Sequence, residues 1–303
     1  MPLWIVVTLF AAFCQNLRSA LQKHLKGRLG TTGATFVRFG YGFPFALAYV
    51  GVLHWGFGMA LPVPGADFAV AAVLGGLAQI GATFLLVHLF SFRNFAVGTA
   101  YSKTEPVQAA LFGVLILGEH VDLSAAIAIA VGVAGVILIS MARVPMTAKA
   151  ILASLTGKPA LIGLASAALF GASAAFYRAA SLALEGPGYL MQAAYALAVV
   201  TAFQSVVMIV WMALREPDQL KASCVHWRQA VWVGLVGVAG SAGWFTAMTL
   251  QQVAYVRALA QVELVFTLAF SWFVFRERAN GRELAGCVLI VAAILGLLWG
   301  RMG

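Results

Sequence analysis

The sequence predicts an all-α membrane protein with ten transmembrane helices, arranged as two inverted five-helix repeats. Three observations predict this fold class. Of the 303 residues, 62% are hydrophobic and only 10% are charged, whereas roughly one quarter of the residues are charged in soluble domains. Apolar segments of about 20 residues, long enough to cross a hydrocarbon core of about 30 Å, recur along the chain. The two halves of the chain are also similar to each other.

Ten apolar segments define the expected helices, and short polar connections separate them. Their approximate limits are 3–22, 32–54, 66–89, 95–117, 123–141, 160–182, 188–213, 229–251, 254–275 and 282–300. Almost no chain is left for a soluble domain. Basic residues do not precede the first segment but follow it, as Lys23, Lys26 and Arg28. We therefore expect a retained first helix and not a cleaved signal peptide.

The basic residues of the connections predict the orientation in the membrane. Thirteen Lys and Arg residues fall in the connections after the odd-numbered helices, against two, Arg257 and Arg301, on the other side. By the positive-inside rule, both termini are expected to be extracytoplasmic in a multi-pass protein of the cell inner (plasma) membrane. The net charge of +9 is then mostly a signal of topology. Because the basic residues are scattered over short loops, nucleic-acid binding is not expected.

An internal repeat relates the two halves at an offset of 158 residues. Glu105 falls on Glu263 and Glu119 on Glu277, without a gap from about 95 to 143. The chain has only ten acidic residues, so two coinciding pairs are hard to attribute to chance. Each repeat holds an odd number of helices, so the second must enter the membrane from the opposite side. The expected units are residues 1–141 and 160–303, joined by a cytoplasmic linker at 142–159. Glu119 and Glu277 are interpreted as boundary residues beside loops.

Two segments carry a resemblance to a known family. They are EPVQAALFGVLILGEHVDLSAAIAIAVGVAGVILI, residues 105–139, and VELVFTLAFSWFVFRERANGRELAGCVLIVAAILGLL, residues 262–298. The first resembles the signature of the EamA-like branch of the drug/metabolite transporter superfamily, and the second resembles its second copy, with Leu264 where proline is common and Arg276 for a glycine. The resemblance implies ten helices around a central cavity, with the fifth helix of each repeat as an outer support. It also implies the movement of small metabolites, often outward.

The stretch YSKTEPVQ, residues 101–108, places charges inside an apolar segment. A charge at the centre of a membrane helix costs about 2.5 to 3.5 kcal/mol on insertion scales, so it persists only where it faces a partner or water. Lys103 and Glu105 are two residues apart and point about 200° away from each other, so they are not expected to pair. Pro106 lacks an amide hydrogen and is expected to break the helix at this depth. We therefore expect part of the substrate site here.

The candidate substrate-binding residues are polar or aromatic and lie within expected spans. They are Lys103, Glu105, Glu263, Tyr101, Trp244, Gln261, His88, Gln79, Arg38 and Arg178. Structural roles are the alternative for several of them. The two glutamates could be buried partners that only lock helices together. Arg178, like Arg18, could extend along a helix end towards the membrane surface. A lone polar group such as His88 is often satisfied by packing across helices.

These residues predict a secondary transporter that works by alternating access, and outward transport is the expected direction. Lys103 together with Glu105 and Glu263 offers both signs of charge, which suits amino acids or related zwitterions. Two alternatives stay open. Cationic drugs or quaternary amines would use the glutamates with an aromatic cage. Organophosphates or nucleotide sugars would use Lys103, Arg38 and Arg178 to bind the anion.

Other classes of function are disfavoured by missing motifs. The sequence has no His-Glu-x-x-His, no Gly-x-Ser-x-Gly and no phosphate-cradling glycine loop, and its three cysteines form no spaced pair. No cofactor and no metal are expected, and an integral-membrane enzyme or a channel is the less favoured alternative. The expected partners are a small-molecule substrate, protons if the glutamates couple their movement to transport, and the lipid bilayer. The chain is expected to function as a monomer.

Overall fold

The computed structural model describes residues 2–92, 101–141, 157–186, 188–266 and 281–299, and the regular elements in these ranges are all helical. Within them, six helical segments are long and apolar enough to cross a membrane. They are Leu3–Gly56, Ala66–Leu89, Leu123–Ser140, Lys158–Leu182, Tyr189–Arg215 and Trp227–Leu250. The all-helical prediction is confirmed. The expected ten spans include residues outside the described ranges and stay a prediction.

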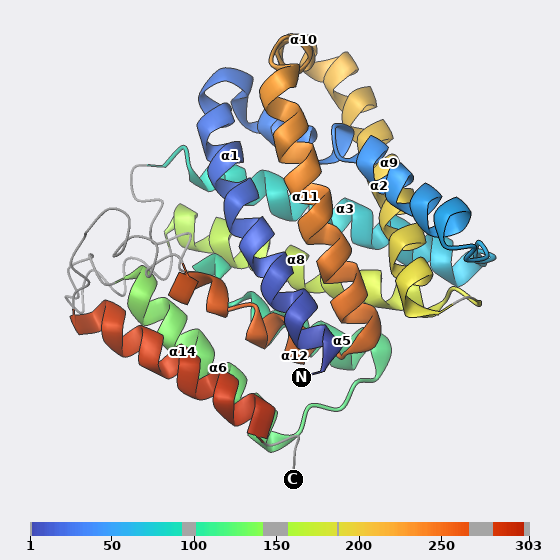
Figure 1. The fold of residues 1–303 in the computed structure, drawn as a ribbon. Helices are drawn as coiled ribbons and strands as arrows, with labels where there is room; N and C mark the ends of the chain where they lie inside the picture. Colours follow the sequence, from blue (N-terminus) through green and yellow to red (C-terminus); the bar gives the residue numbers. More distant parts are fainter. Residues whose placement is uncertain (1, 93–100, 142–156, 187, 267–280, 300–303) are drawn as a thin grey trace.

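The first half of the chain forms helices that Figure 1 colours from blue to green. They are α1 (Leu3–Gly40), α2 (Phe43–Gly51), the π-helical turn η1 (Val52–Gly56), α3 (Ala66–Leu89), α5 (Glu105–Leu117) and α6 (Leu123–Ser140). The helices of the second half are α8 (Lys158–Leu182), α9 (Tyr189–Arg215), α10 (Pro217–Val225), α11 (Trp227–Leu250), α12 (Val253–Leu259) and α14 (Gly281–Trp299).

Helix α1 runs past the predicted end of the first span and bends at Gly30. The backbone there has φ 70° and ψ −173°, and a positive φ favours glycine because it has no Cβ. A Cβ at Gly30 would also lie 2.5 Å from Oε1 of Gln219 on α10. The same oxygen accepts a hydrogen bond from the Gly33 amide at 2.9 Å. The polar Gln219 side chain thus supports the bend that separates the first two expected spans.

The main helix contacts are symmetric: each remains a contact when the equivalent helices of the two halves are interchanged. Helix α1, the first of its half, packs against α11, while α3 packs against α8, the first helix of the second half. Helices α2 and α9 pack together, as do α5 and α12. Helices α6 and α14 form a separate pair at one edge of the molecule (Figure 1). Each half therefore contributes one helix to each of these contacts.

Small residues allow the closest of these contacts. A Cβ added at Gly243 of α11 would lie 2.8 Å from the Cβ of Ala11, and one at Gly240 would lie 3.1 Å from the Cβ of Cys14. On α8, a Cβ at Gly171 would lie 2.8 Å from the backbone nitrogen of Ala109. These glycines let backbones approach closely, which is how small residues act between membrane helices.

Large apolar side chains cover the outside of the bundle as well as its core. Phe13, Trp55, Leu115, Leu214 and Trp232 are among those exposed. Buried polar side chains lie inside instead, where hydrogen bonds and ion pairs are available. This distribution suits a protein whose surrounding solvent is lipid.

Candidate substrate-binding site

Two helix breaks lie opposite each other at the start of α5 and the end of α12. The chain leaves the helical conformation at Lys103 and Thr104, and α5 begins at Glu105 with Pro106 in its first turn. That position tolerates proline because the missing amide would have no helical partner. The second break falls at Ala260 and Gln261, after which helix resumes. The two breaks correspond within one residue at the repeat offset of 158.

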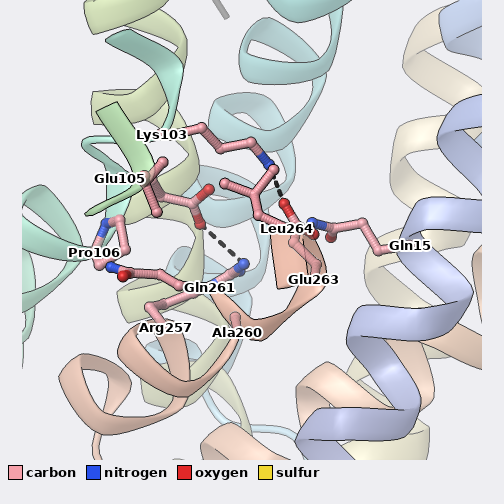
Figure 2. A pocket seen from close by; sticks show the side chains of 10 residues that line it. Gln15, Lys103, Glu105, Pro106, Arg257, Ala260, Gln261, Glu263 and Leu264 are labelled. Carbon is pink, nitrogen blue, oxygen red and sulfur yellow. Dashed lines mark hydrogen bonds and ion pairs between the residues drawn. The ribbon is translucent and has the colours of Figure 1, made fainter. Parts of the chain in front are cut away.

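Two ion pairs cross between the halves at these breaks (Figure 2). The Lys103 ammonium pairs with the Glu263 carboxylate, and Arg257 Nη1 lies 2.9 Å from Glu105 Oε1. Gln15 of α1 donates a further hydrogen bond to Glu263 Oε2 at 3.1 Å. Lys103 and Glu105 therefore each find a partner in the other half. Each pair couples the position of α5 to that of the chain around α12.

A cavity of about 160 Å³ lies beside the ion pairs. Its lining residues are Gln15, Asn16, Arg18, Ser19, Arg38, Gln79, Leu86, Phe90, Ser102, Lys103, Glu105, Phe170, Trp244, Arg257 and Glu263. A smaller space of about 30 Å³ lies at the breaks themselves, where Gln261 and Pro106 join the lining (Figure 2). Charged, polar and aromatic side chains from both halves thus meet in one enclosure.

Arg38 reaches this cavity from the second half of α1. Its Nη1 donates to Thr83 Oγ1 at 3.0 Å. The Gln79 amide, oriented so that its oxygen faces Arg38, accepts from the guanidinium at 2.7 and 3.0 Å. These two neutral partners hold the guanidinium in place without neutralising its charge.

Arg18 also lines the cavity and is only 6% exposed. Its Nε has no hydrogen-bond partner among the described residues. The position is well inside α1 and next to Gly237 of α11. The interpretation of Arg18 as a side chain extended to the membrane surface is therefore wrong, because the side chain is enclosed by protein.

Arg257 corrects the sequence-based loop assignment. The loop count placed it outside the membrane, but it is 7% exposed within α12 and pairs with Glu105. Its guanidinium carbon lies 4.8 Å from the ring centroid of Trp244, a cation–π arrangement. Only Gln251 and Gln252 separate α11 from α12, so position 257 already lies inside the bundle. The charge asymmetry of the loops increases once Arg257 is removed from the outer side.

Arg178 lies outside this cavity, in a second buried cluster. Its Nε is 2.6 Å from Glu119 Oε1. Its Nη1 donates to the carbonyl oxygens of Met248 and, at 2.8 Å, Gln251. Glu119 Oε2 also accepts from the Val253 amide at 3.2 Å. Arg178 therefore ties the end of α5 to the junction between α11 and α12.

Glu119 lies directly after the end of α5 and beside a loop, as predicted, but the expected surface charge is wrong, because this residue is only 8% exposed. The chain turns back at Gly118, which has φ 64°, and the Glu119 amide donates to the Gly113 carbonyl at 3.2 Å. This helix-ending turn directs the residue after the glycine back against its own helix. Glu277, its repeat equivalent, lies outside the described residues.

The remaining candidates divide by position. Trp244 and Gln79 line the larger cavity, and Gln261 lines the smaller one. His88 lies between two rings of its own segment, with centroids 6.1 Å from Phe84 and 5.2 Å from Phe92. Neither His88 nor Tyr101 lines a cavity described here.

Sequence reasoning did not single out several polar residues of α1. Gln15, Asn16 and Ser19 all line the cavity. Their spacing with Arg18 and Gln22 was a usable signal, since positions three and four apart share one face of a helix. A polar face in an otherwise apolar span points to a cavity or a polar partner.

A helical bundle with paired broken helices and a charged internal cavity is typical of membrane carriers. The chain belongs to the EamA-like transporter family, whose model matches residues 2–141 and 157–299. This family is part of the drug/metabolite transporter superfamily, so the protein is a multi-pass membrane transporter and not an enzyme.

Solved structures share the fold. One of them, described only as the crystal structure of a protein, is 17% identical, covers 97% of this chain and 98% of its own, and has a TM-score of 0.66. Twenty-three solved chains match in all. At this identity the likeness concerns the fold alone. No curated protein matches the chain.

Proposed function

We propose that the protein is a secondary transporter that moves a small charged metabolite across the cell inner membrane by alternating access. The observation that carries the proposal is the pair of ion bridges, Lys103 to Glu263 and Arg257 to Glu105, at two broken helices beside a cavity. Ionisable groups inside a membrane are costly and concentrate on substrate and ion pathways. Broken helices mark the binding sites of many carriers.

The symmetry of the helix contacts between the two halves supports an inverted-repeat architecture. Helix α1 packs on α11 as α8 packs on α3, and α6 packs on α14, which is the pattern expected from a two-fold axis between halves. We propose ten spans in two five-helix units, with both termini extracytoplasmic. Transport would follow from the two units rocking about the charged cavity, and export is the proposed direction.

The substrate class can be narrowed by the charges of the cavity. Lys103 and Glu105, the expected partners of a zwitterion, are already engaged in ion pairs. To bind there, an amino acid would have to break one of these ion pairs and replace it with contacts to its own ammonium and carboxylate groups. Cationic drugs are disfavoured, because Arg18 and Arg38 line the cavity in addition to the two balanced pairs.

Counterflow in proteoliposomes tests the transporter proposal. Vesicles that contain purified protein and an unlabelled solute should take up the labelled form of that solute faster than vesicles that contain the protein but no unlabelled solute. Uptake should saturate as the concentration of labelled solute rises. Glu105→Gln should reduce this counterflow at least ten-fold, because it disturbs the bridge between halves. Glu185→Gln, the same change at an exposed carboxylate, should leave it unchanged. Flux that rises linearly with concentration and shows no counterflow would indicate a channel and contradict the proposal.

A further inference from the structure

The charges that line the larger cavity do not balance. Four cations lie on its described lining, against two carboxylates. Lys103 and Arg257 are matched by Glu263 and Glu105. Neither Arg18 nor Arg38 forms an ion pair of its own among the described residues. The described lining therefore has a net charge of +2.

The other acidic residues do not supply the missing anions. Glu119 is taken by Arg178. The remaining described acids lie in connections, at helix ends or in the first turn of a helix: Asp67, Asp122, Glu185, Glu216, Asp218 and Glu283. None of them lines the cavity. With only ten acidic residues in the chain and Glu277 outside the described ranges, little protein anion is available to this site.

We infer that the transported metabolite is a small organic oxyanion, a carboxylate or a phosphate ester, whose anionic group binds between Arg18 and Arg38. This inference rests on the transporter function proposed above and names its substrate class. Both arginines are more than nine-tenths buried. Arg18 Nε lacks a hydrogen-bond partner in the described chain, and guanidinium groups suit the planar, forked geometry of carboxylates and phosphates.

The neutral partners of Arg38 fit a binding role. Thr83 and Gln79 fix its guanidinium by hydrogen bonds, so little side-chain freedom is lost when an anion arrives. A structural arginine in lipid is usually matched by a carboxylate or by backbone carbonyls, as Arg178 is in this protein. Arg38 is held by uncharged side chains and keeps its charge for a ligand.

The size and walls of the cavity limit the rest of the substrate. Its volume is about 160 Å³, and a cavity of about 150 Å³ holds a molecule the size of benzene. A metabolite of this size has about six to ten non-hydrogen atoms, far fewer than a nucleotide sugar. Phe90, Phe170 and Trp244 provide an apolar wall for its carbon skeleton.

Four labelled probes test the inference in the counterflow assay: succinate as a dicarboxylate, glycerol 3-phosphate as a phosphate ester, glutamine as a zwitterion and choline as a cation. We expect saturable counterflow of succinate or of glycerol 3-phosphate. The anion with the lower KM shows whether the site prefers a carboxylate or a phosphate ester. Arg18→Gln and Arg38→Gln should each raise the KM for that anion at least ten-fold. Arg38→Lys, which retains the charge, should restore part of the loss. Arg215→Gln, the same change at an exposed arginine, should have no effect.

The outcomes separate this inference from the transporter proposal. Counterflow of glutamine or choline without either anion would overturn the anion inference and leave the transporter proposal standing. Counterflow of an anion with an unchanged KM in both arginine variants would also overturn it, because the anion would then bind elsewhere. No counterflow of any probe by monodisperse protein would contradict both proposals. If the glutamine variants do not fold, Arg38→Lys gives the decision: a raised KM for the anion supports the inference, and an unchanged KM overturns it.

Discussion

Replacing Glu105 with glutamine should strand a cation inside the membrane bundle. The variant keeps the side-chain shape but removes the carboxylate 2.9 Å from Arg257. Arg257 already lies over the Trp244 ring in the unaltered protein, so we do not expect that contact to offset the loss. Removing one partner of a buried pair costs about 3 to 5 kcal/mol. Because the Glu105 side chain is 18% exposed, we expect the lower end, a loss of about 3 kcal/mol in the free energy of unfolding.

A second change, Arg257→Gln in the same chain, removes the stranded cation. Replacing both members of a buried ion pair by neutral groups is often close to neutral for stability. We therefore expect the double variant to recover about half or more of the stability lost in Glu105→Gln, because the stability effects of substitutions at contacting residues are not additive. Denaturant unfolding of purified protein in detergent micelles measures both free energies. Glu185→Gln is the matched control at an exposed carboxylate.

Two results would refute this reasoning. If Glu105→Gln unfolds like the wild type, water reaches the pair and screens it, and the cavity is not an enclosed low-polarity site. If the double variant loses the sum of the two single losses, Glu105 and Arg257 act through different partners. In either case the ion pair could not be the bridge that couples α5 to α12.

Three further outcomes are expected. Gly30→Ala should lower the free energy of unfolding by about 1 to 2 kcal/mol, because the positive φ disfavours a Cβ and Gln219 occupies the space, whereas Gly27→Ala, with open space around its Cβ, should not destabilise. An alkaline-phosphatase fusion at Gly303 should be active and a cytoplasm-only fluorescent fusion silent, and the reverse pattern would invert the proposed topology. If Glu105 and Glu263 carry coupling protons, changing either to glutamine should flatten the pH dependence of uptake. An unaltered pH profile in both variants would favour facilitated diffusion.

The helix positions could largely be predicted from the sequence, because apolar length is set by membrane thickness. The expected span 66–89 matches α3 (Ala66–Leu89), and 229–251 lies within two residues of α11 (Trp227–Leu250). The first helix extends beyond the expected span 3–22. Lys23 and the polar residues after it mark where the chain leaves the apolar layer, but the helix continues to the bend at Gly30. Composition locates the membrane boundary, whereas a positive-φ glycine ends the first straight segment.

The charged centre of the site could be predicted, but its pairing could not. Lys103, Glu105 and Glu263 were identifiable because each interrupts an apolar run, and such interruptions are costly whatever the partner. Their partners depend on which helix faces which, and no periodicity within one helix contains that information. Arg257 had the same signature, a single charge in VAYVRALA. It was counted with the outer-side residues although it lies inside the expected span 254–275, and the short α11–α12 connection makes that position interior.

Two arginines at equivalent positions of the two halves have different surroundings. Arg18 and Arg178 correspond at an offset of 160 residues, yet Arg178 is bound to Glu119 and to backbone carbonyls, while Arg18 lines the larger cavity. Two identical halves in identical conformations would treat both arginines alike. Alternating access between inverted repeats instead requires that equivalent elements differ in any one state and exchange their roles during transport. The unequal environments of Arg18 and Arg178 fit a carrier held in one of its two states.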